Sequence, residues 1–543
     1  MLMSNMRRVN PAKKENLLEG SHVNRRNFVL SGAATALAAF ADGLPTLKYS
    51  ASKTGVNLIP ETPSGAPNYW CTWAVQNYMY GHHLQELSPE ILEGDSDSRL
   101  AHNAMNEQVL LGKDGWAHAF FPRIRKDLYL MLDDGWESGG TATFELDAAK
   151  FPSFSGSPAE RLAGLNKAIQ AADWRGAALW CRNTPGGIKD ERLEMLSQDA
   201  DVRYWKIDIG DPEFHLVDVR KSEHTQLQFE HVHGEPPLNG DWHRDGRFGT
   251  QFRGSRRQQI LAHTDVYRTY DVTSILSLPT TLDRLAEMLK GAQGQTNVHA
   301  LLNVEDEVYV AAVIGCTMGV LRHPLDGLRP GPDTDLFFNG PRKAKRRMDE
   351  VVRALRWQRI APPFAAGSGS IEVSNEILTD SWTFERGQTW ETDLVGLTTH
   401  QGAPACIARN IALPRVTSSG EKPFVFVSKF PNGAVAVGIQ ERTRPGRAWY
   451  MPLANVELNV GDAQGPIGVF GSCATLSLIF DKPLAGKRIL AQDLASDVAL
   501  DVTDRVRIDG QRLQLTEANL RSFGLRTVSK GDLSSPGIIL ALR

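Results

Sequence analysis

The sequence predicts a mixed α/β protein in which a (β/α)8 TIM barrel is followed by a C-terminal antiparallel β-sandwich domain. Short apolar segments alternate with helical patterns over residues 50–365, which is typical of a parallel barrel. Residues 371–543 instead carry short alternating segments separated by turn signals. A chain of 543 residues is also too long for one compact core, so at least two structural domains are expected.

Eight apolar segments in the first of these domains have the composition of buried strands. In chain order they are NYWCTWAV, DLYLMLDDGW, GAALWC, RYWKID, LQFEHV, QQILAHTD, NVHALLNV and CTMGVLR. Amphipathic helices are expected at residues 157–173, where Ser157 and Glu160 have the spacing of a capping box, and at residues 280–292. A doubly wound open sheet is the alternative. Such a sheet would have a glycine-rich phosphate-binding loop after an early strand, and the sequence has none there.

The second domain begins after a run of proline and small residues at 362–370, which reads as a linker. The segments that follow are rich in Val, Leu and Phe and are separated by Gly, Pro, Asn and Asp. The pairs Asn432-Gly433 and Asp509-Gly510 are hairpin turn signals. These features predict the antiparallel β-sandwich.

The first 45 residues predict a leader. Arg25 and Arg26 precede an Ala-rich apolar run that ends near residue 40, as in a twin-arginine export signal. The run is too short and too rich in Ala and Gly for a convincing membrane span. We therefore expect export to the periplasm or beyond with no stable membrane span, and a disordered basic tail is the alternative.

Composition narrows the classes of partner and cofactor. The net charge of -3 offers no large basic field, so nucleic acid is not an expected partner. The five cysteines are far apart and contain no CxxC pair, so neither a zinc cluster nor a disulfide framework is indicated. No cofactor and no metal are predicted, and the oligomeric state stays open.

Acidic, polar and aromatic residues gather where the predicted strands end, and barrels build their active sites at the carboxyl ends of their strands. They are Trp70 and Trp73 on the first strand, Asp133, Asp134 and Trp136 on the second, Lys206 and Asp208 on the fourth, Glu230 and His231 on the fifth, Asp265, Arg268 and Asp271 around the sixth, and residues 305–307 on the seventh. Carboxylates that converge with tryptophans indicate a sugar-cleaving site. Any single carboxylate could instead cap the next helix, and Trp136 could belong to the core.

Two other classes of site are weaker alternatives. His231 and His233 form an HxH pair, which with Asp133 and Asp134 could bind a metal in a metal-dependent hydrolase. A serine hydrolase is not indicated, because the sequence has no G-x-S-x-G elbow. A non-catalytic carbohydrate-binding protein on the same scaffold would have lost one catalytic carboxylate, whereas candidates for both are present.

The segment VRYWKIDIGD places a lysine and an aspartate two residues apart in an apolar strand. Lys206 and Asp208 therefore point to the same face. Alone, such a pair could be a buried salt bridge, which is weak evidence for any function. In a catalytic site the lysine would help to keep the carboxylate ionised against the desolvation that favours its neutral form.

The second and fourth strands resemble motifs of clan D glycoside hydrolases, the α-galactosidase (melibiase) group. LYLMLDDGW is similar to the second-strand motif whose carboxylate pair, here Asp133 and Asp134, binds sugar hydroxyls. YWKID is similar to the K-x-D motif, which implies that Asp208 is the nucleophile and that Lys206 binds ring hydroxyls. The group has a barrel followed by an antiparallel sandwich, so the resemblance covers both domains.

Other strands extend the resemblance. YWCTW keeps a W-x-x-W spacing that puts Trp73 against the sugar, and QFEHV puts Glu230 near the 2-hydroxyl. VYRTYDV is similar to the strand-six segment and implies that Arg268 is its arginine and Asp271 its acid/base. The spacing there is one residue shorter than in the family, so Asp265 remains the alternative acid/base.

The resemblance implies an exported glycoside hydrolase that cleaves α-galactoside-type bonds in an oligosaccharide or polysaccharide. It implies a retaining double displacement with Asp208 and Asp271 as the catalytic pair. The other expected substrate-binding residues are Trp73, Asp133, Asp134, Trp136, Lys206, Glu230 and Arg268. α-N-Acetylgalactosaminide, β-L-arabinopyranoside and α-glucan specificities remain alternatives.

Overall fold

The computed structural model describes the greater part of the chain beyond residue 54. The described residues are 55–80, 102–139, 143–182, 190–208, 228–231, 261–262, 264–269, 277–324, 347–383, 398–445 and 447–543. The predicted leader at residues 1–45 and the predicted acid/base Asp271 lie outside them, so both stay predictions. None of the described helices is long and apolar enough to cross a membrane.

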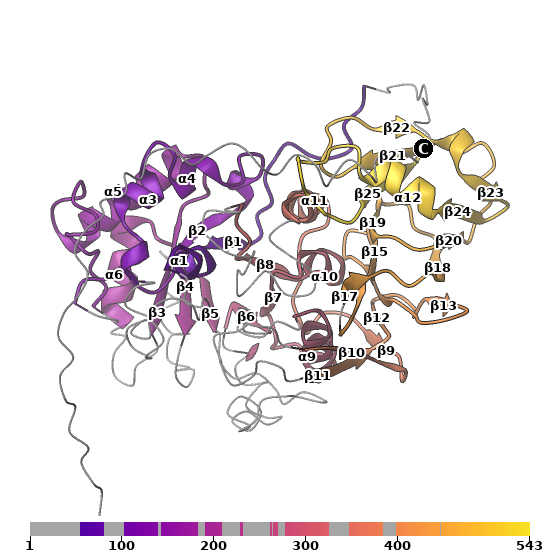
Figure 1. Cartoon of the computed structure of the whole chain (residues 1–543), viewed down its shortest axis with the longest axis horizontal. Helices are drawn as coiled ribbons and strands as arrows, with labels where there is room; N and C mark the ends of the chain where they lie inside the picture. Colours follow the sequence, from indigo (N-terminus) through magenta and orange to yellow (C-terminus); the bar gives the residue numbers. More distant parts are fainter. Residues whose placement is uncertain are drawn as a thin grey trace, which may run out of the picture. The chain divides into compact units, whose positions relative to one another are not determined.

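Eight parallel strands form a closed barrel (Figure 1). The strands are β1 (Tyr69–Cys71), β2 (Tyr129–Leu132), β3 (Ala177–Arg182), β4 (Tyr204–Asp208), β5 (Gln228–His231), β6 (Val266–Arg268), β7 (Leu301–Glu305) and β8 (Thr317–Val320). Each strand pairs with the next one in the chain, and β1 also pairs with β8. Parallel neighbours need a crossover connection, and this places all eight carboxyl ends at one rim.

Helices lie in most of the described connections between barrel strands, and α11 follows the last of these strands. They are α1 (Trp73–Tyr80), α3 (Glu107–Leu111), α4 (Trp116–Ala119) and the 3-10 helix η2 (Arg125–Asp127) before β2, then α5 (Pro158–Ala171), α6 (Asp190–Ala200), α9 (Ser277–Ala292), α10 (Val308–Ile314) and α11 (Met348–Gln358). The predicted capping box of α5 is confirmed, since the Ser157 and Glu160 side chains each accept from the other residue's backbone N–H. The connections after β4 and β5 lie mostly outside the described residues, so the complete eightfold helical shell stays a prediction.

Side chains alternate between two faces along the barrel strands, as the period of a strand requires. On β4, Trp205 and Ile207 join the large apolar cluster shared with the helices, whereas Tyr204 packs in the barrel interior against Tyr69 and Tyr129. The odd-numbered residues Trp205 and Ile207 therefore face outward, and the even-numbered residues Tyr204, Lys206 and Asp208 face inward. The interior is thus apolar and aromatic below Lys206 and charged from there to the carboxyl rim.

The second half of the chain forms two main sheets, with two hairpins beside them. The larger sheet contains β22 (Leu500–Asp501), β21 (Ile489–Asp493), β25 (Gly537–Leu542), β19 (Ile467–Gly471), β15 (Val435–Gln440), β14 (Phe424–Lys429), β12 (Cys406–Arg409) and β9 (Ile371–Val373) in that order. The smaller contains β13 (Arg415–Thr417), β18 (Asn455–Gly461), β20 (Thr475–Phe480), β24 (Arg512–Thr516) and β23 (Arg507–Asp509). The remaining elements are β10 (Ile377–Thr383), β11 (Thr398–Pro404), β16 (Arg442–Arg444), β17 (Arg447–Tyr450), the 3-10 helix η5 (Thr503–Arg505) and α12 (Glu517–Gly524).

The predicted hairpin turns of this half are confirmed. Gly433 joins the antiparallel strands β14 and β15 with φ of 84°, and Gly510 joins β23 and β24 with φ of 56°. The prediction of a purely antiparallel sandwich is wrong, because β12 with β14, β15 with β19, and β18 with β20 pair in parallel. The chain visits the other sheet or a hairpin between the two members of each pair, so the second member returns in the same direction.

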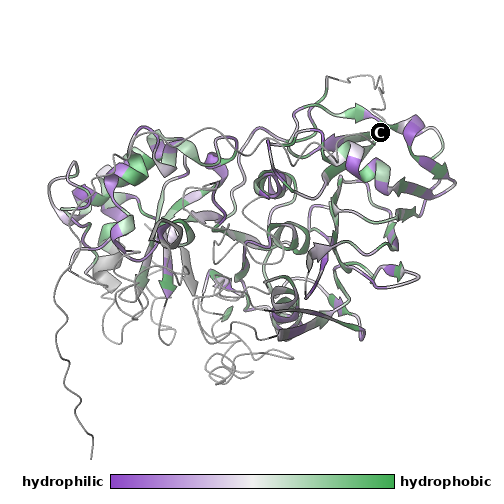
Figure 2. Ribbon diagram, in the orientation of Figure 1, coloured by the Kyte–Doolittle hydropathy of each residue, from purple (hydrophilic) through white to green (hydrophobic). Residues whose placement is uncertain are grey.

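The larger sheet is buried on both faces. Val425 and Val427 of β14 belong to the apolar cluster shared with the smaller sheet. Phe424 and Phe426, on the opposite face, join the cluster that contains Trp357 of α11. Hydrophobic segments accordingly recur along these strands in Figure 2. Strands buried on both sides need apolar residues at successive positions, which explains the continuous run in FVFV.

One buried arginine joins the two halves of the chain across the predicted linker. Arg409 of β12 donates hydrogen bonds to the carbonyls of Ile314, at the end of α10, and of Ala365, at 2.8 and 2.5 Å. Its guanidinium also lies 3.6 Å from the ring centroid of Phe364. Burial lowers the pKa of Arg409 to about 10, so the group stays charged at neutral pH and faces the negative end of the helix.

Candidate functional site

Lys206 forms an ion pair across the barrel interior. Its Nζ donates to Asp133 Oδ2 at 2.7 Å, and the two side chains are 3% and 5% exposed. The Cys71 thiol donates to the same oxygen at 3.0 Å. Burial alone would lower the pKa of Lys206, but the nearby acidic groups, Asp133 first and then Cys71 and Glu305, together outweigh burial and raise that pKa above its ordinary value. Burial and Asp133 also raise the pKa of Cys71, so Cys71 remains a thiol donor and is no nucleophile.

Asp208 has different partners from its strand neighbour Lys206. Trp180 of β3 donates its Nε1–H to Asp208 Oδ2 at 3.0 Å. Arg268 Nη2 lies 3.8 Å from the same oxygen. The Asp208 side chain is 15% exposed, and this makes it more accessible than Asp133. The two residues thus share the inner face, as predicted, while the direct partner of Lys206 is Asp133.

Glu305 completes the inner charged group and was missed as a binding or catalytic residue. It is fully buried at the end of β7, and its Oε1 accepts a hydrogen bond from Arg268 Nη1 and another, at 3.3 Å, from the Tyr69 hydroxyl. Its position in the acidic run 305–307 was the only signal. Its partner could not be read from the sequence, because Arg268 lies on a different strand.

The second carboxylate of the DDGW segment lies nearer the rim. Asp134 is 18% exposed and pairs with His102 Nε2 at 3.0 Å, and its backbone N–H donates to Asp133 Oδ1 at 2.9 Å. Trp73, partly buried at the start of α1, lies with its ring centroid 6.3 Å from that of His102. The two adjacent aspartates therefore differ in setting, since Asp133 is sealed in an ion pair and Asp134 remains partly open to solvent.

Trp136 belongs to the core, which corrects its prediction as a wall of the sugar site. Its side chain is fully buried, its Nε1–H donates to the Trp180 carbonyl at 2.8 Å, and its ring lies 6.4 Å from Trp205. Gly135, with φ of 111°, precedes Trp136 in a backbone conformation that favours glycine. A ring enclosed in this way has no face to offer a ligand.

Asp265 lies away from the other candidates. It precedes β6, so it is at the amino end of the strand, while Arg268 is at the carboxyl end. By strand alternation Asp265 also shares the face of Tyr267, which packs in the outer cluster. This position argues against Asp265 as the proton donor opposite Asp208.

Three candidates cannot be placed fully. The backbone of Glu230 pairs with Lys206 on one side and Val266 on the other, but its side chain lies outside what the structure describes, as does that of His231. Asp271 lies outside the described residues altogether. Within the described part of the chain, no group of three or more His, Cys, Asp and Glu residues is arranged to hold a metal ion. The acid/base and the HxH metal alternative therefore stay predictions.

Asp306, the residue after Glu305, predicts a pH dependence of stability. It is buried, its Oδ1 accepts from the backbone N–H groups of Leu321 and Arg322, and burial raises its pKa to about 7. The folded protein therefore holds this proton up to about pH 7, whereas the unfolded chain releases it near pH 4. Its stabilising contribution is complete below pH 4 and is lost at about 1.4 kcal/mol per pH unit as the pH rises toward 7.

Asp306→Asn should remove this slope. The amide keeps an acceptor for the two N–H groups, and asparagine tolerates the left-handed backbone, with φ of 54°. We expect the melting temperature of the natural protein, measured relative to the variant, to fall between pH 5 and pH 7. A difference that is constant over that range would contradict the prediction.

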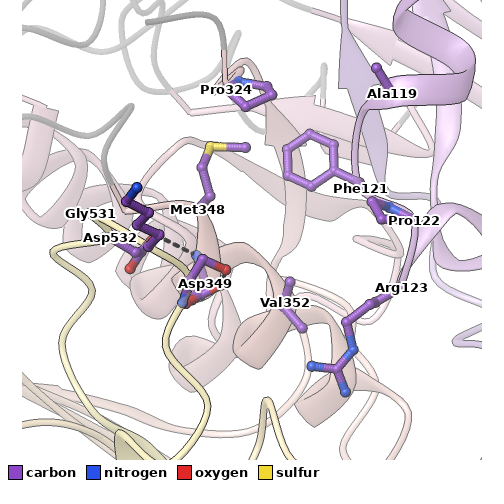
Figure 3. Close-up of a pocket in the computed structure, with 12 residues that line it drawn as sticks. Ala119, Phe121, Pro122, Arg123, Pro324, Met348, Asp349, Val352, Gly531 and Asp532 are labelled. Atoms are coloured by element: carbon purple, nitrogen blue, oxygen red, sulfur yellow. Dashed lines mark hydrogen bonds between the residues drawn. The ribbon is translucent and has the colours of Figure 1, made fainter. Parts of the chain in front are cut away.

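A cavity of about 380 Å³ lies elsewhere (Figure 3). Its lining residues are Ala119, Phe121, Pro122, Arg123, Pro324, Met348, Asp349, Val352, Ser529, Lys530, Gly531 and Asp532. None of them was predicted as a site residue. Its two carboxylates already accept hydrogen bonds: Asp349 from Ser529, and Asp532 from the backbone of Asp349 and of Ser534. These two carboxylates therefore do not require a ligand.

Comparisons with known proteins add little to this description. No protein-family model matches the chain, and no curated protein matches it. Among solved structures, the carboxyl transferase domain of Rhizobium etli pyruvate carboxylase with pyruvate matches at 14% identity and a TM-score of 0.27. The match covers 58% of this chain and 56% of that one, and a likeness this low carries no argument. The site is therefore interpreted from its own residues.

Proposed function

We propose that the protein is a glycoside hydrolase, exported by the twin-arginine route, that cleaves α-galactoside-type bonds with retention of configuration. The observation that carries the proposal is the setting of Asp208. A partly exposed carboxylate at the carboxyl rim of a closed parallel barrel accepts a hydrogen bond from Trp180 and faces Arg268 at 3.8 Å. Arg25 and Arg26 support the export route.

Asp208 is the nucleophile in this proposal. Its carboxylate attacks the anomeric carbon as the bond to the leaving oxygen breaks, and a covalent glycosyl-enzyme forms. Asp271 donates its proton to the leaving oxygen and then takes one from the water that hydrolyses the intermediate. Two cations lie near Asp208 and favour its charged form: Lys206 on the same face of β4, and Arg268 with Nη2 at 3.8 Å.

Sugar binding falls to the groups that surround Asp208. An ammonium has three N–H donors, so Lys206 can serve a hydroxyl while it holds Asp133. Asp134 and Trp73, both partly open at the rim, supply an acceptor and an aromatic face for the ring. Glu230 and Arg268 complete the proposed set, and Trp136 is left out because it is buried.

A panel of 4-nitrophenyl glycosides tests the proposal. The purified protein should hydrolyse the α-galactoside faster than the α-N-acetylgalactosaminide, the β-L-arabinopyranoside or the α-glucoside. The anomer first released, followed by NMR, should have the configuration of the substrate. Failure to hydrolyse any member of the panel would overturn the assignment as a glycosidase, and release of the opposite anomer would overturn retention alone.

Asp271→Asn tests the acid/base. The asparagine cannot protonate the leaving oxygen, so substrates with poor leaving groups should lose about 10²-fold or more in kcat/KM. An activated aryl glycoside, whose leaving group needs little protonation, should lose much less. The measurement is the ratio of kcat/KM for a galactosyl disaccharide and for 4-nitrophenyl galactoside. Equal losses on both substrates would assign proton donation to another residue.

A further inference from the structure

The inner charged group contains one guanidinium between two carboxylates. Arg268 donates from Nη1 to Glu305, while Nη2 faces Asp208 at 3.8 Å. Arg268 is 3% exposed and Glu305 is fully buried, so this ion pair is sealed from solvent while Asp208 remains partly open. Charges interact strongly where water is excluded. The positive charge of Arg268 that Glu305 neutralises therefore does not stabilise the carboxylate of Asp208.

The neighbouring strands accommodate Glu305 in this position. Gly319 of β8 lies beside it, and a Cβ there would come within 2.9 Å of Glu305 Cγ and 2.6 Å of the Tyr69 hydroxyl oxygen. The hydroxyl donates to Glu305 at 3.3 Å. Three strands thus surround this side chain: β7 carries Glu305, Tyr69 of β1 donates a hydrogen bond to it, and Gly319 of β8 leaves space for it.

We infer that Glu305 is a positioning residue: it anchors Arg268 and thereby sets the ionisation and reactivity of Asp208. The assignment of Asp208 as nucleophile rests on the proposed function, but the effect of Glu305 on its titration does not. In this inference Glu305 acts on Asp208 through Arg268, to which it is hydrogen-bonded, and not by contact with the sugar or the reacting atoms.

The other charged groups that the structure describes around Asp208 are paired or neutral, and the side chain of Arg182, beside Asp208 on β3, is not among them. From β4 and β2, Lys206 and Asp133 form their own ion pair. On β3, Cys181 is a neutral thiol. Its pKa is raised mainly by burial, and further by the negative charges of Glu137 and, to a smaller extent, Asp208. The side chains of β5 are outside the structure's description. Among the described cations near Asp208, Arg268 is therefore the one that Glu305 binds, so Glu305 sets how strongly Arg268 attracts the Asp208 carboxylate.

Glu305→Gln is the test. Glutamine keeps the size and an acceptor for Arg268 but removes the charge, so more of the guanidinium charge acts on Asp208. The titration midpoint of Asp208 should fall by about one pH unit, and kcat/KM on its plateau should fall about tenfold, because a better-stabilised carboxylate is a weaker nucleophile. The melting temperature is recorded alongside.

The midpoint can be measured without turnover. Trp180 donates to Asp208, so protonation of the carboxylate should change tryptophan emission; the pH titration of Asp208→Asn, subtracted from that of the natural protein, isolates this signal. The same subtraction is made for Glu305→Gln and Glu305→Gln/Asp208→Asn. Asp306→Asn is the control for a change of side chain beside Glu305: the Asp306 carboxyl is already neutral below about pH 7, so the variant removes no charge there and should leave the midpoint in place.

Each outcome decides the inference. The inference is supported if the titration midpoint of Asp208 falls in Glu305→Gln and is unchanged in Asp306→Asn. This holds even if no glycoside is hydrolysed and the proposed function fails. An unmoved midpoint in an active glycosidase overturns it and leaves the function standing. If Glu305→Gln does not fold, Tyr69→Phe replaces it: loss of the hydroxyl should draw Arg268 toward Glu305 and raise the midpoint, and no change would overturn the inference.

Discussion

Asp208→Asn is expected to reduce the turnover of 4-nitrophenyl α-galactoside by about 10⁴-fold or more, as loss of a covalent nucleophile does in other enzymes. The amide has nearly the volume of the carboxylate, and its oxygen can still accept from Trp180. The fold should therefore persist while attack on the anomeric carbon stops. Initial rates and the melting temperature, measured on the same preparation, separate the two effects.

Asp265→Asn is the matched control for this variant. It makes the same chemical change on an aspartate that precedes β6, at the opposite end of the strand from Arg268. Its rate should stay close to that of the natural protein, because the side chain lies at the opposite end of the strand from the proposed site. Near-normal turnover by Asp208→Asn would remove the nucleophile assignment, and a large loss in Asp265→Asn would restore that residue as a candidate acid/base.

Lys206→Met is expected to destabilise the protein by about 3–5 kcal/mol, because it leaves Asp133 charged, buried and without its cation. Methionine fills much of the space of the lysine stem, so the loss is mainly electrostatic. A chain of 543 residues need not unfold in a two-state transition. The shift in melting temperature at pH 7 is therefore the preferred measurement.

The double variant Lys206→Met/Asp133→Asn is the control for the ion pair. It removes both charges and should be more stable than Lys206→Met alone, although Asp133 also holds the Cys71 thiol. A Lys206→Met protein as stable as the natural one would show that the pair contributes nothing to the fold. Loss of activity in either variant would not discriminate, because both residues also belong to the proposed sugar site.

Several elements could be predicted from the sequence because they depend on interactions between residues that are close together in the chain. The capping box of α5 depends on residues three apart, and the turns at Gly433 and Gly510 depend on a single left-handed residue. Alternation along β4 placed Lys206 and Asp208 on one face, since successive side chains in any strand point to opposite sides. The order of eight strands in a parallel barrel follows from strands alternating with helical crossovers.

Other features depend on residues that meet only after folding. The sequence by itself determined that Lys206 and Asp208 share a face; the tertiary structure decided that Lys206 pairs with Asp133, 73 residues away, and that Arg268 lies between Asp208 and Glu305. Burial of Trp136 was decided in the same way, because aromatic residues are equally suited to a core and to a sugar site. The physical reason is that strand periodicity fixes the direction of a side chain, whereas its partner, and hence its charge state, depends on which strands become neighbours.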